Sequence, residues 1–205
     1  MKKNNFNRTL KKRKKLFGGG KIIKINVKSY GVLGLNEEDV ARGKTVEIHP
    51  DIVIVDSAGY DFINGNTTTG AAGVSGAIYR YIGLEKFPDK VRETLLNKSE
   101  GISKYHEYPA TKERGLVNCI HVIAPDFTKN DTEPVKRLIT AYLSVFKAFL
   151  NSKKSRLRLL PISGGVFTGK YKSEIPYFTK KAIITALEKL DANDLEEFRT
   201  GTGTK

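Results

Sequence analysis

Six residues in the first half of the chain constrain its fold more than any other segment. Residues 51–56 read Asp-Ile-Val-Ile-Val-Asp, with four consecutive β-branched residues between two aspartates. A strand that is apolar on both faces is typical of the centre of a parallel sheet, where helices cover both sides. The run therefore predicts a buried central strand, and the rest of the chain must supply helices for both faces of its sheet.

Apolar runs and helical periodicity alternate along the remaining chain. The expected elements are strands at 22–27, 51–56, 117–124 and 156–161, and helices that begin near Val74, Pro88, Pro134 and Tyr177. Such alternation predicts an α/β fold, a three-layer α/β/α sandwich with a mainly parallel central sheet. Residues 57–70, rich in Gly, Asn and Thr, are expected to form a long loop.

Positive charge is concentrated at the start of the chain. Residues 1–21 hold nine lysines and arginines and no acidic residue, so most of the formal net charge of +14 lies there. A segment of one charge with few apolar residues does not bury enough surface to order itself. We expect a flexible basic tail over 1–20, an α/β domain over 21–192 and a polar C-terminal tail over 193–205. The basic tail is either a solvated appendage or an arm that binds nucleic acid or an assembly partner.

Composition excludes several classes of protein. The single cysteine, Cys119, cannot form an intramolecular disulfide, and no Cys/His cluster has zinc-site spacing. No apolar run approaches the roughly 18 residues of a membrane span, and no apolar segment follows the basic start as in a secretory signal. We therefore expect an intracellular protein, cytoplasmic or nuclear or carried in a virus particle, with no metal, no cofactor and no membrane partner.

Two glycine-rich turns are the strongest sign of a binding site. Residues 69–79 read Thr-Gly-Ala-Ala-Gly-Val-Ser-Gly-Ala-Ile-Tyr, and residues 162–167 read Ile-Ser-Gly-Gly-Val-Phe. Glycine lets backbone N–H groups approach a ligand closely, and a helix N-terminus adds partial positive charge. Ligands of open α/β sheets bind beyond the carboxyl ends of the strands. The two turns predict a cleft for a phosphorylated ligand, in particular a nucleotide diphosphate.

Two common nucleotide motifs come close to these turns but do not fit. The first turn has glycines at 70, 73 and 76, whereas the dinucleotide fingerprint is Gly-x-Gly-x-x-Gly. Residues 164–170 match the P-loop spacing, but Tyr171 follows Lys170 and cannot supply the hydroxyl that binds Mg²⁺. Pro176 also delays the helix that a P-loop requires. Both motifs are disfavoured.

Four segments, taken in order, resemble a known family. They are Ile-Val-Asp-Ser-Ala-Gly at 54–59, Gly-Val-Ser-Gly-Ala-Ile at 73–78, Ile-His-Val-Ile-Ala-Pro at 120–125 and Leu-Pro-Ile-Ser-Gly-Gly-Val-Phe at 160–167. Their order and spacing over about residues 44–190 resemble the macro domain, an ADP-ribose-binding module, and the third segment looks like the macro domains of RNA viruses. Macro domains carry Ile-Val-Asn-Ala-Ala-Asn at the first segment.

The resemblance implies that ADP-ribose is held by both turns. The implied binding residues are Ser57, Ala58, Gly59, Gly70, Ala71, Ala72, Gly73, Val74 and Ser75 on one side, and Ser163, Gly164, Gly165, Val166 and Phe167 on the other. Backbone amides would hold the pyrophosphate. Phe167 would pack on the distal ribose or, alternatively, belong to the core. Glu47 is the candidate for the adenine amino group, unless it is an ordinary glutamate of a surface strand.

Two departures from the family bear on catalysis. The first family asparagine falls on Asp56, and the second, which holds the distal ribose and is important in hydrolytic members, falls on Gly59. The catalytic residues are therefore unknown; Asp56, Asn64 and Asn66 are the candidates to replace that asparagine, although the two asparagines equally suit turns. His121, inside an apolar strand, is expected to be a core residue.

Three functions remain open at this point. The chain binds ADP-ribose or mono-ADP-ribosylated protein, or it hydrolyses the ADP-ribosyl bond, or its fold is a degenerate macro domain in a nucleic-acid-associated particle. The geometry of the two turns separates them. An open groove with inward-pointing amides favours binding, and a groove filled by Phe167 or by residues 59–70 does not.

Overall fold

The computed structural model describes residues 31–46, 48–97, 100–130 and 132–200 of the 205-residue chain. The elements are α1 (Glu37–Ala41), β1 (Ile52–Ala58), α2 (Tyr60–Gly65), α3 (Gly73–Ile82), α4 (Asp89–Leu96), β2 (Ser103–Tyr108), β3 (Val117–Ile123), α5 (Pro134–Ser152), β4 (Arg156–Arg158), the 3₁₀ turn η1 (Gly169–Tyr171), α6 (Ile175–Glu188) and α7 (Ala192–Thr200). The predicted basic tail, the strand expected at 22–27, Glu47 and residues 201–205 lie outside the described residues.

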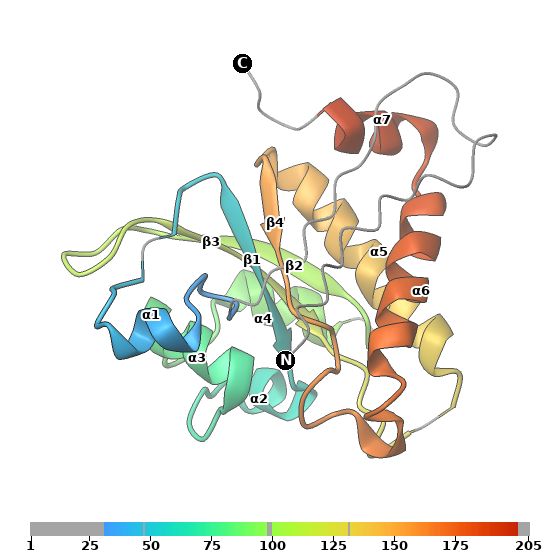
Figure 1. The fold of residues 1–205 in the computed structure, drawn as a ribbon, viewed down its shortest axis with the longest axis horizontal. Helices are drawn as coiled ribbons and strands as arrows, with labels where there is room; N and C mark the ends of the chain where they lie inside the picture. The colour runs from blue at the N-terminus through green and yellow to red at the C-terminus, as the bar shows by residue number, and fades with distance from the viewer. Residues whose placement is uncertain (1–30, 47, 98–99, 131, 201–205) are drawn as a thin grey trace.

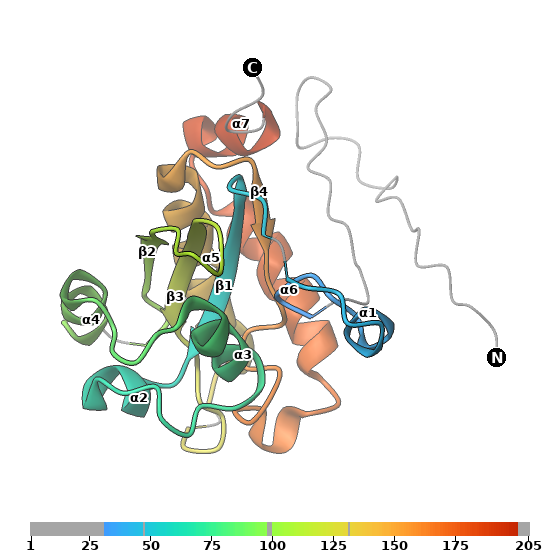
Figure 2. The same cartoon turned by 90° about the vertical axis from the view of Figure 1, so that its left-hand side faces the viewer.

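Within these residues the sheet has four strands in the order β2-β3-β1-β4. β1 pairs in parallel with β3 and with β4, and only the β2–β3 pair is antiparallel. Helices lie on both sides of the sheet, with α5 and α6 on one face and α2, α3 and α4 on the other (Figures 1 and 2). The predicted α/β/α sandwich with a mainly parallel sheet is confirmed.

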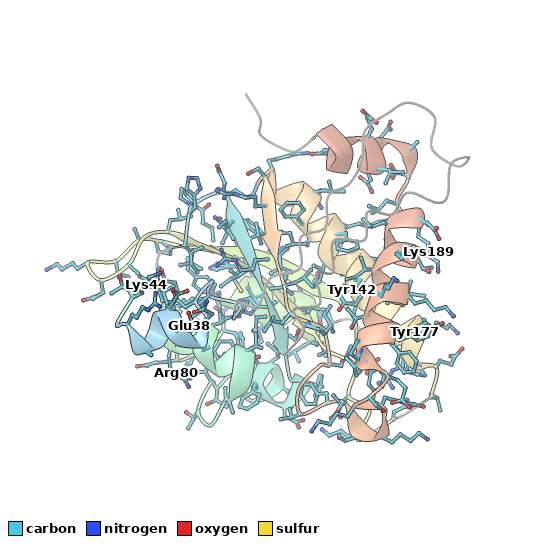
Figure 3. The ribbon with its side chains drawn as sticks, in the orientation of Figure 1. Glu38, Lys44, Arg80, Tyr142, Tyr177 and Lys189 are labelled. Atoms are coloured by element: carbon cyan, nitrogen blue, oxygen red, sulfur yellow. The ribbon has the colours of Figure 1, made fainter. Side chains whose placement is uncertain are left out.

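The α5/α6 face holds the larger apolar core. Val53 and Val55 of β1 and Ile120 and Val122 of β3 point into it, because alternate residues of a strand face the same side. α5 contributes a long buried stripe that includes Tyr142, which lies between the sheet and α6 (Figure 3). Burial on this face fixes the position of the chain that leaves β4.

The opposite face holds a second core. Ile54 of β1 and Cys119 of β3 pack there against Ile78 and Tyr79 of α3 and against α4. The same alternation that places Ile54 on this side also places Asp56 and His121 there, and both are fully buried. This face therefore contains buried ionisable side chains as well as apolar packing.

Four segments differ from the sequence-based expectation. The loop expected over 57–70 contains helix α2, which ends at Gly65, and the strand expected at 156–161 is paired only over Arg156–Arg158. Strand β2 has a mixed polar sequence, Ser-Lys-Tyr-His-Glu-Tyr, and the apolar pattern did not predict it. Helix α7 occupies most of the polar segment expected at 193–205. Its Lys153–Glu197 ion pair to the segment after α5 spans 2.6 Å.

No helix in the described part of the chain is long and apolar enough to cross a membrane. Among the same residues, no group of three or more His, Cys, Asp or Glu side chains is arranged to hold a metal ion.

Candidate functional site

Both glycine-rich turns contact the carboxyl end of β1. The Ser75 hydroxyl lies 3.3 Å from the carbonyl oxygen of Ser57, and the ring of Phe167 lies against Gly59. Ser57 and Gly59 are two residues apart, or about 7 Å along an extended chain. The first glycine loop (residues 70–75) and the second glycine loop (residues 163–167) therefore meet at one edge of the sheet, as the sequence predicts.

The first glycine loop ends in the N-terminus of α3. The helix begins at Gly73, which has a φ of 57°, and its N-cap residue, Ala72, makes no side-chain hydrogen bond. The first amides of a helix have no partner within the helix. The described residues likewise offer no acceptor to the amides of Gly73, Val74 and Ser75. Three backbone donors are thus available to an anion at this end of α3.

Gly76 allows the first glycine loop to fold back over the helix. A Cβ atom at this position would lie 2.3 Å from the carbonyl oxygen of Ala71, a distance that no side chain tolerates. The glycine therefore permits the close packing of residues 71 and 76, which places the loop directly beside α3.

Neutral hydrogen bonds hold the second glycine loop. The Ile162 amide donates to the buried Tyr142 hydroxyl at 2.9 Å, and the Ser163 hydroxyl donates to the Pro125 carbonyl at 2.6 Å. The Phe127 amide donates to the Phe167 carbonyl at 3.0 Å. Ser163 is held at a φ of 58°, so the chain turns sharply at the base of the loop.

The tip of the second glycine loop is exposed. Gly164 and Gly165 are exposed, and the Val166 side chain is 79% exposed. Within the described residues, the amides of Gly165, Val166 and Phe167 donate no hydrogen bond. The loop thus offers a second set of three backbone donors.

Phe167 and Phe62 cover Gly59. A Cβ atom at residue 59 would lie 3.0 Å from Cζ of Phe167 and 3.3 Å from Cδ2 of Phe62. Gly59 itself is buried. Phe167 is partly buried and packs against the core of the α5/α6 face. A side chain at residue 59 would therefore need the two aromatic rings to shift by a few tenths of an ångström.

A buried polar network lies beneath the first glycine loop. The Asp56 carboxylate accepts hydrogen bonds from Ser75 Oγ at 2.6 Å and from the Tyr79 hydroxyl at 2.8 Å, and its Oδ2 is 2.7 Å from Nδ1 of His121. Nε2 of His121 lies 2.8 Å from the Tyr108 hydroxyl. The network joins β1, α3, β3 and β2, and it fixes the first turn of α3 from below.

Burial controls the acid–base behaviour of the network's hydroxyls. Burial, reinforced by the charge of Asp56, raises the pKa of Tyr79 far above its ordinary value. Burial likewise raises the pKa of Tyr108 and of the Cys119 thiol, and it lowers the pKa of His106, whose ring packs on Tyr108. Both tyrosines therefore keep their protons and act as neutral hydrogen-bond partners.

The three catalytic candidates differ in burial and in hydrogen bonding. Asn66 is the left-handed C-cap of α2, and its Oδ1 accepts from the Phe87 amide at 3.0 Å. Asn64 is exposed, and its carbonyl accepts from Arg92 at 2.9 Å. Asp56 is fully buried and fully engaged by its three partners. His121 is a buried core residue, as expected.

The other predicted binding residues divide by exposure. Gly70, Ala72 and Gly73 are exposed, Ser57, Ala71, Val74 and Ser75 are partly buried, and Ala58 and Ser163 are buried. A hollow of about 330 Å³ lies beside the first glycine loop and shares Gly70 and Ala71 with it. Arg80 and Glu85 also line this hollow, and no residue of the second glycine loop does.

The motifs missed three side chains that build the site. Tyr79, Tyr108 and Tyr142 each place a hydroxyl inside a core. The helical spacing could have identified Tyr79, because Tyr79 lies one helical turn after Ser75 and on the same face of α3. For Tyr108 the only signal is an alternating aromatic pattern in a polar strand, which did not identify β2.

Comparison with protein-family models finds no match, and comparison with curated protein sequences finds none either. Solved structures do match. A glycine-to-valine mutant of the Oceanobacillus iheyensis macrodomain, with ADPR, is similar to this chain at a TM-score of 0.50 and 18% identity. The match covers 75% of this chain and 85% of that one.

Two further structures match at lower TM-scores. The Oceanobacillus iheyensis macrodomain with ADP has a TM-score of 0.48 and 16% identity, over 75% of this chain and 83% of that chain. An alphavirus P23pro-zbd structure has a TM-score of 0.45 and 19% identity, over 79% of this chain and 25% of that chain. The first of the three matches, together with the layers and strand order above, shows that the described residues have a macrodomain-like fold.

Proposed function

We propose that this protein binds ADP-ribose, free or attached to protein, by gripping its diphosphate between the two glycine loops, and that it does not hydrolyse the ADP-ribosyl bond. One observation carries the proposal. Amides of Gly73–Ser75 and of residues 165–167 have no acceptor in the described chain, and both sets flank the carboxyl end of β1. Backbone amides at a helix N-terminus are suited to phosphate oxygens.

The similar macrodomains support the choice of ligand. They were solved with ADPR and with ADP, which share an adenosine diphosphate group. Val166 and the adjoining glycines leave the tip of the second glycine loop exposed, so Phe167 does not cover these donors. The packing of Phe167 therefore alters the space around Gly59 without removing the diphosphate grip.

The space around Gly59 is the reason to propose binding without turnover. Hydrolysis needs a water held in a defined position by polar groups. Gly59 has no side chain, and the nearest groups to the space where one would begin are aromatic carbons of Phe167 and Phe62, at 3.0 and 3.3 Å. The Asn66 side chain binds the Phe87 amide and is not free to replace the missing group.

Calorimetric titration with ADP-ribose tests binding, and two pairs of variants test the amides. Val74→Pro removes one donor at the second residue of α3, where proline is tolerated, and Val74→Ala keeps that donor. Val166→Pro and Val166→Ala form the matched pair on the second glycine loop. A hydrogen bond to a charged group contributes about 1.5–3 kcal/mol, so each proline should weaken binding about tenfold or more.

Each alanine control should bind nearly as wild type does. Absence of binding by the wild-type protein at millimolar ADP-ribose would reject the proposal. The alternative of a structural, nucleic-acid-associated protein would then gain, and it rests on residues 1–20. Loss of nucleic-acid retention after deletion of those residues would support that alternative, whereas equal retention would exclude it. For turnover, release of label from an ADP-ribosylated substrate by excess protein would overturn the non-hydrolytic part of the proposal.

A further inference from the structure

The network under the first glycine loop contains a charge that anion binding must accommodate. An ionised carboxylate can only accept hydrogen bonds, and Ser75, Tyr79 and His121 can each donate one to Asp56. The contacts therefore fit an ionised Asp56. Its carboxylate is fully buried, directly beneath the helix N-terminus that offers its amides to a phosphate.

His121 can satisfy its contacts in either charge state. Nδ1 donates to Asp56 in both states, and the two states differ only in whether Nε2 carries a proton. The Tyr108 hydroxyl can donate to Nε2 of a neutral imidazole or accept from Nε2–H of an imidazolium. No hydrogen bond has to break when the proton is gained. Histidine is the side chain whose charge ordinarily changes near neutral pH.

Ser75 connects this pair to the ligand. Its backbone amide is one of the three free donors of α3, and its hydroxyl is 2.6 Å from Asp56 Oδ1. A phosphate bound to that amide would be separated from the buried carboxylate only by Ser75 itself. With a neutral imidazole the pair carries one negative charge and repels the phosphate. With an imidazolium the pair is neutral and this repulsion disappears. Salt screens the interaction between the pair and the phosphate only weakly, because it is partly buried.

We infer that Asp56 and His121 set the affinity of the first glycine loop, and that binding of a phosphate there draws a proton onto His121. The inference rests on the proposed function, because it concerns the same diphosphate. Asp56 acts as a positioning residue, since it holds Ser75 and through Ser75 the first turn of α3. His121 adjusts the charge of Asp56 and does not touch the ligand.

Other ionisable groups surround the pair and must be separated from it. They are Tyr79 on α3, Lys104, His106 and Tyr108 on β2, Cys119 on β3, Lys90 on α4, which acts on His106, and Arg114 in the segment before β3. Burial raises the pKa of Tyr79, of Tyr108 and of Cys119, and so keeps all three protonated. His106 is therefore the competing group that an experiment has to exclude.

The test is calorimetry of the full-length protein with ADP-ribose, whose phosphates do not titrate near neutral pH. Titrations at pH 7.5 in two buffers of different ionisation enthalpy give the number of protons taken up on binding. We expect uptake of a fraction of one proton, and an affinity roughly tenfold lower at pH 8.5 than at pH 6, a coupling of the usual size. Because this measurement uses the wild-type chain, it does not depend on a variant that folds.

Two variants assign the proton. Asp56→Asn keeps an acceptor for Ser75 and removes the charge, so it should abolish the proton uptake and bind at pH 8.5 as tightly as wild type does at pH 6. His106→Gln should keep both the uptake and the pH profile. Binding with no proton uptake overturns the inference, as does uptake that survives in Asp56→Asn or disappears in His106→Gln. No binding at any pH overturns the proposed function itself, and is distinct from a flat pH profile.

Discussion

The two glycine loops present similar backbone donors, but different forces hold them in place. The first is anchored from below by the buried, hydrogen-bonded side chains of Asp56 and His121, through the hydroxyl of Ser75. The second is anchored by neutral groups, the Tyr142 hydroxyl under Ile162 and the Ser163 hydroxyl on a carbonyl. Two similar glycine-rich motifs are therefore held in place by different kinds of interaction.

This difference has a physical consequence for stability and binding. A buried charge is costly when it loses its partner, whereas a neutral hydrogen bond contributes only about 0.5–1.5 kcal/mol. Substitution of the side chains that hold the first glycine loop should therefore cause a large, pH-dependent loss of stability. Substitution of those that hold the second glycine loop should cause a smaller loss that does not depend on pH.

The largest effect is expected from removing one member of the buried pair. His121→Leu leaves Asp56 buried without its partner, which costs about 3–5 kcal/mol in comparable pairs. Urea unfolding followed by circular dichroism measures the loss. The double variant Asp56→Asn with His121→Leu should recover part of it, because no uncompensated charge remains. A loss below about 1 kcal/mol in the single variant would show that the pair does not dominate this face.

The next effect comes from the glycines that permit close packing at each loop. Gly76→Ala would place Cβ 2.3 Å from the Ala71 carbonyl, and Gly169→Ala would place it 2.4 Å from the Phe127 carbonyl, at a φ of 52°. Both contacts are with backbone, so each alanine should cost about 1–3 kcal/mol. At Gly76 the clash opposes a gain in helix propensity of about 1 kcal/mol, so Gly169→Ala should be the more harmful.

Gly165→Ala is the matched control for both glycine variants. Nothing lies within 4 Å of a Cβ atom at that position, and its φ does not fall in the left-handed region. Thermal unfolding of the three variants should therefore separate Gly76 and Gly169 from Gly165. Equal melting temperatures for all three would contradict the packing argument.

An effect of comparable size is expected for the hydroxyl that anchors the second glycine loop. Tyr142→Phe keeps the ring in the core and leaves the Ile162 amide without its acceptor, which costs about 1–3 kcal/mol for a buried donor. The loss should be the same at pH 6 and pH 8, unlike that of His121→Leu. Tyr177→Phe is the control, because Tyr177 is 63% exposed on α6 (Figure 3). A pH-dependent loss in Tyr142→Phe would break the contrast between the loops.

How much of this could be predicted depends on whether a residue's role is local. The β-branched run of β1 and the helical spacing after Gly73 are local patterns, and both elements form as expected. Asp56 ends such a run. Its contact with His121, and the contact of His121 with Tyr108, join strands far apart in sequence. No spacing rule predicts those contacts.

Phe167 illustrates the same limit within the site. The sequence allowed it to pack on a ligand or in the core, and the structure places it against the core and over Gly59. From the sequence, Gly59 stands where related domains carry a polar asparagine side chain. The structure adds that a side chain there would press on the rings of Phe62 from α2 and of Phe167 from the second glycine loop.

The smallest effect concerns His106 at the margin of the first loop's network. Burial lowers the pKa of His106 below its ordinary 6.5, so the unfolded chain takes up this proton more readily than the folded chain does. The associated stability is present above about pH 6.5 and is lost as the pH falls from there through the lower pKa of the folded state. Wild type should therefore lose more stability between pH 7.5 and 5.5 than His106→Gln, measured by urea midpoints. An equal loss in both proteins would mean that burial of His106 does not contribute to the pH dependence of stability.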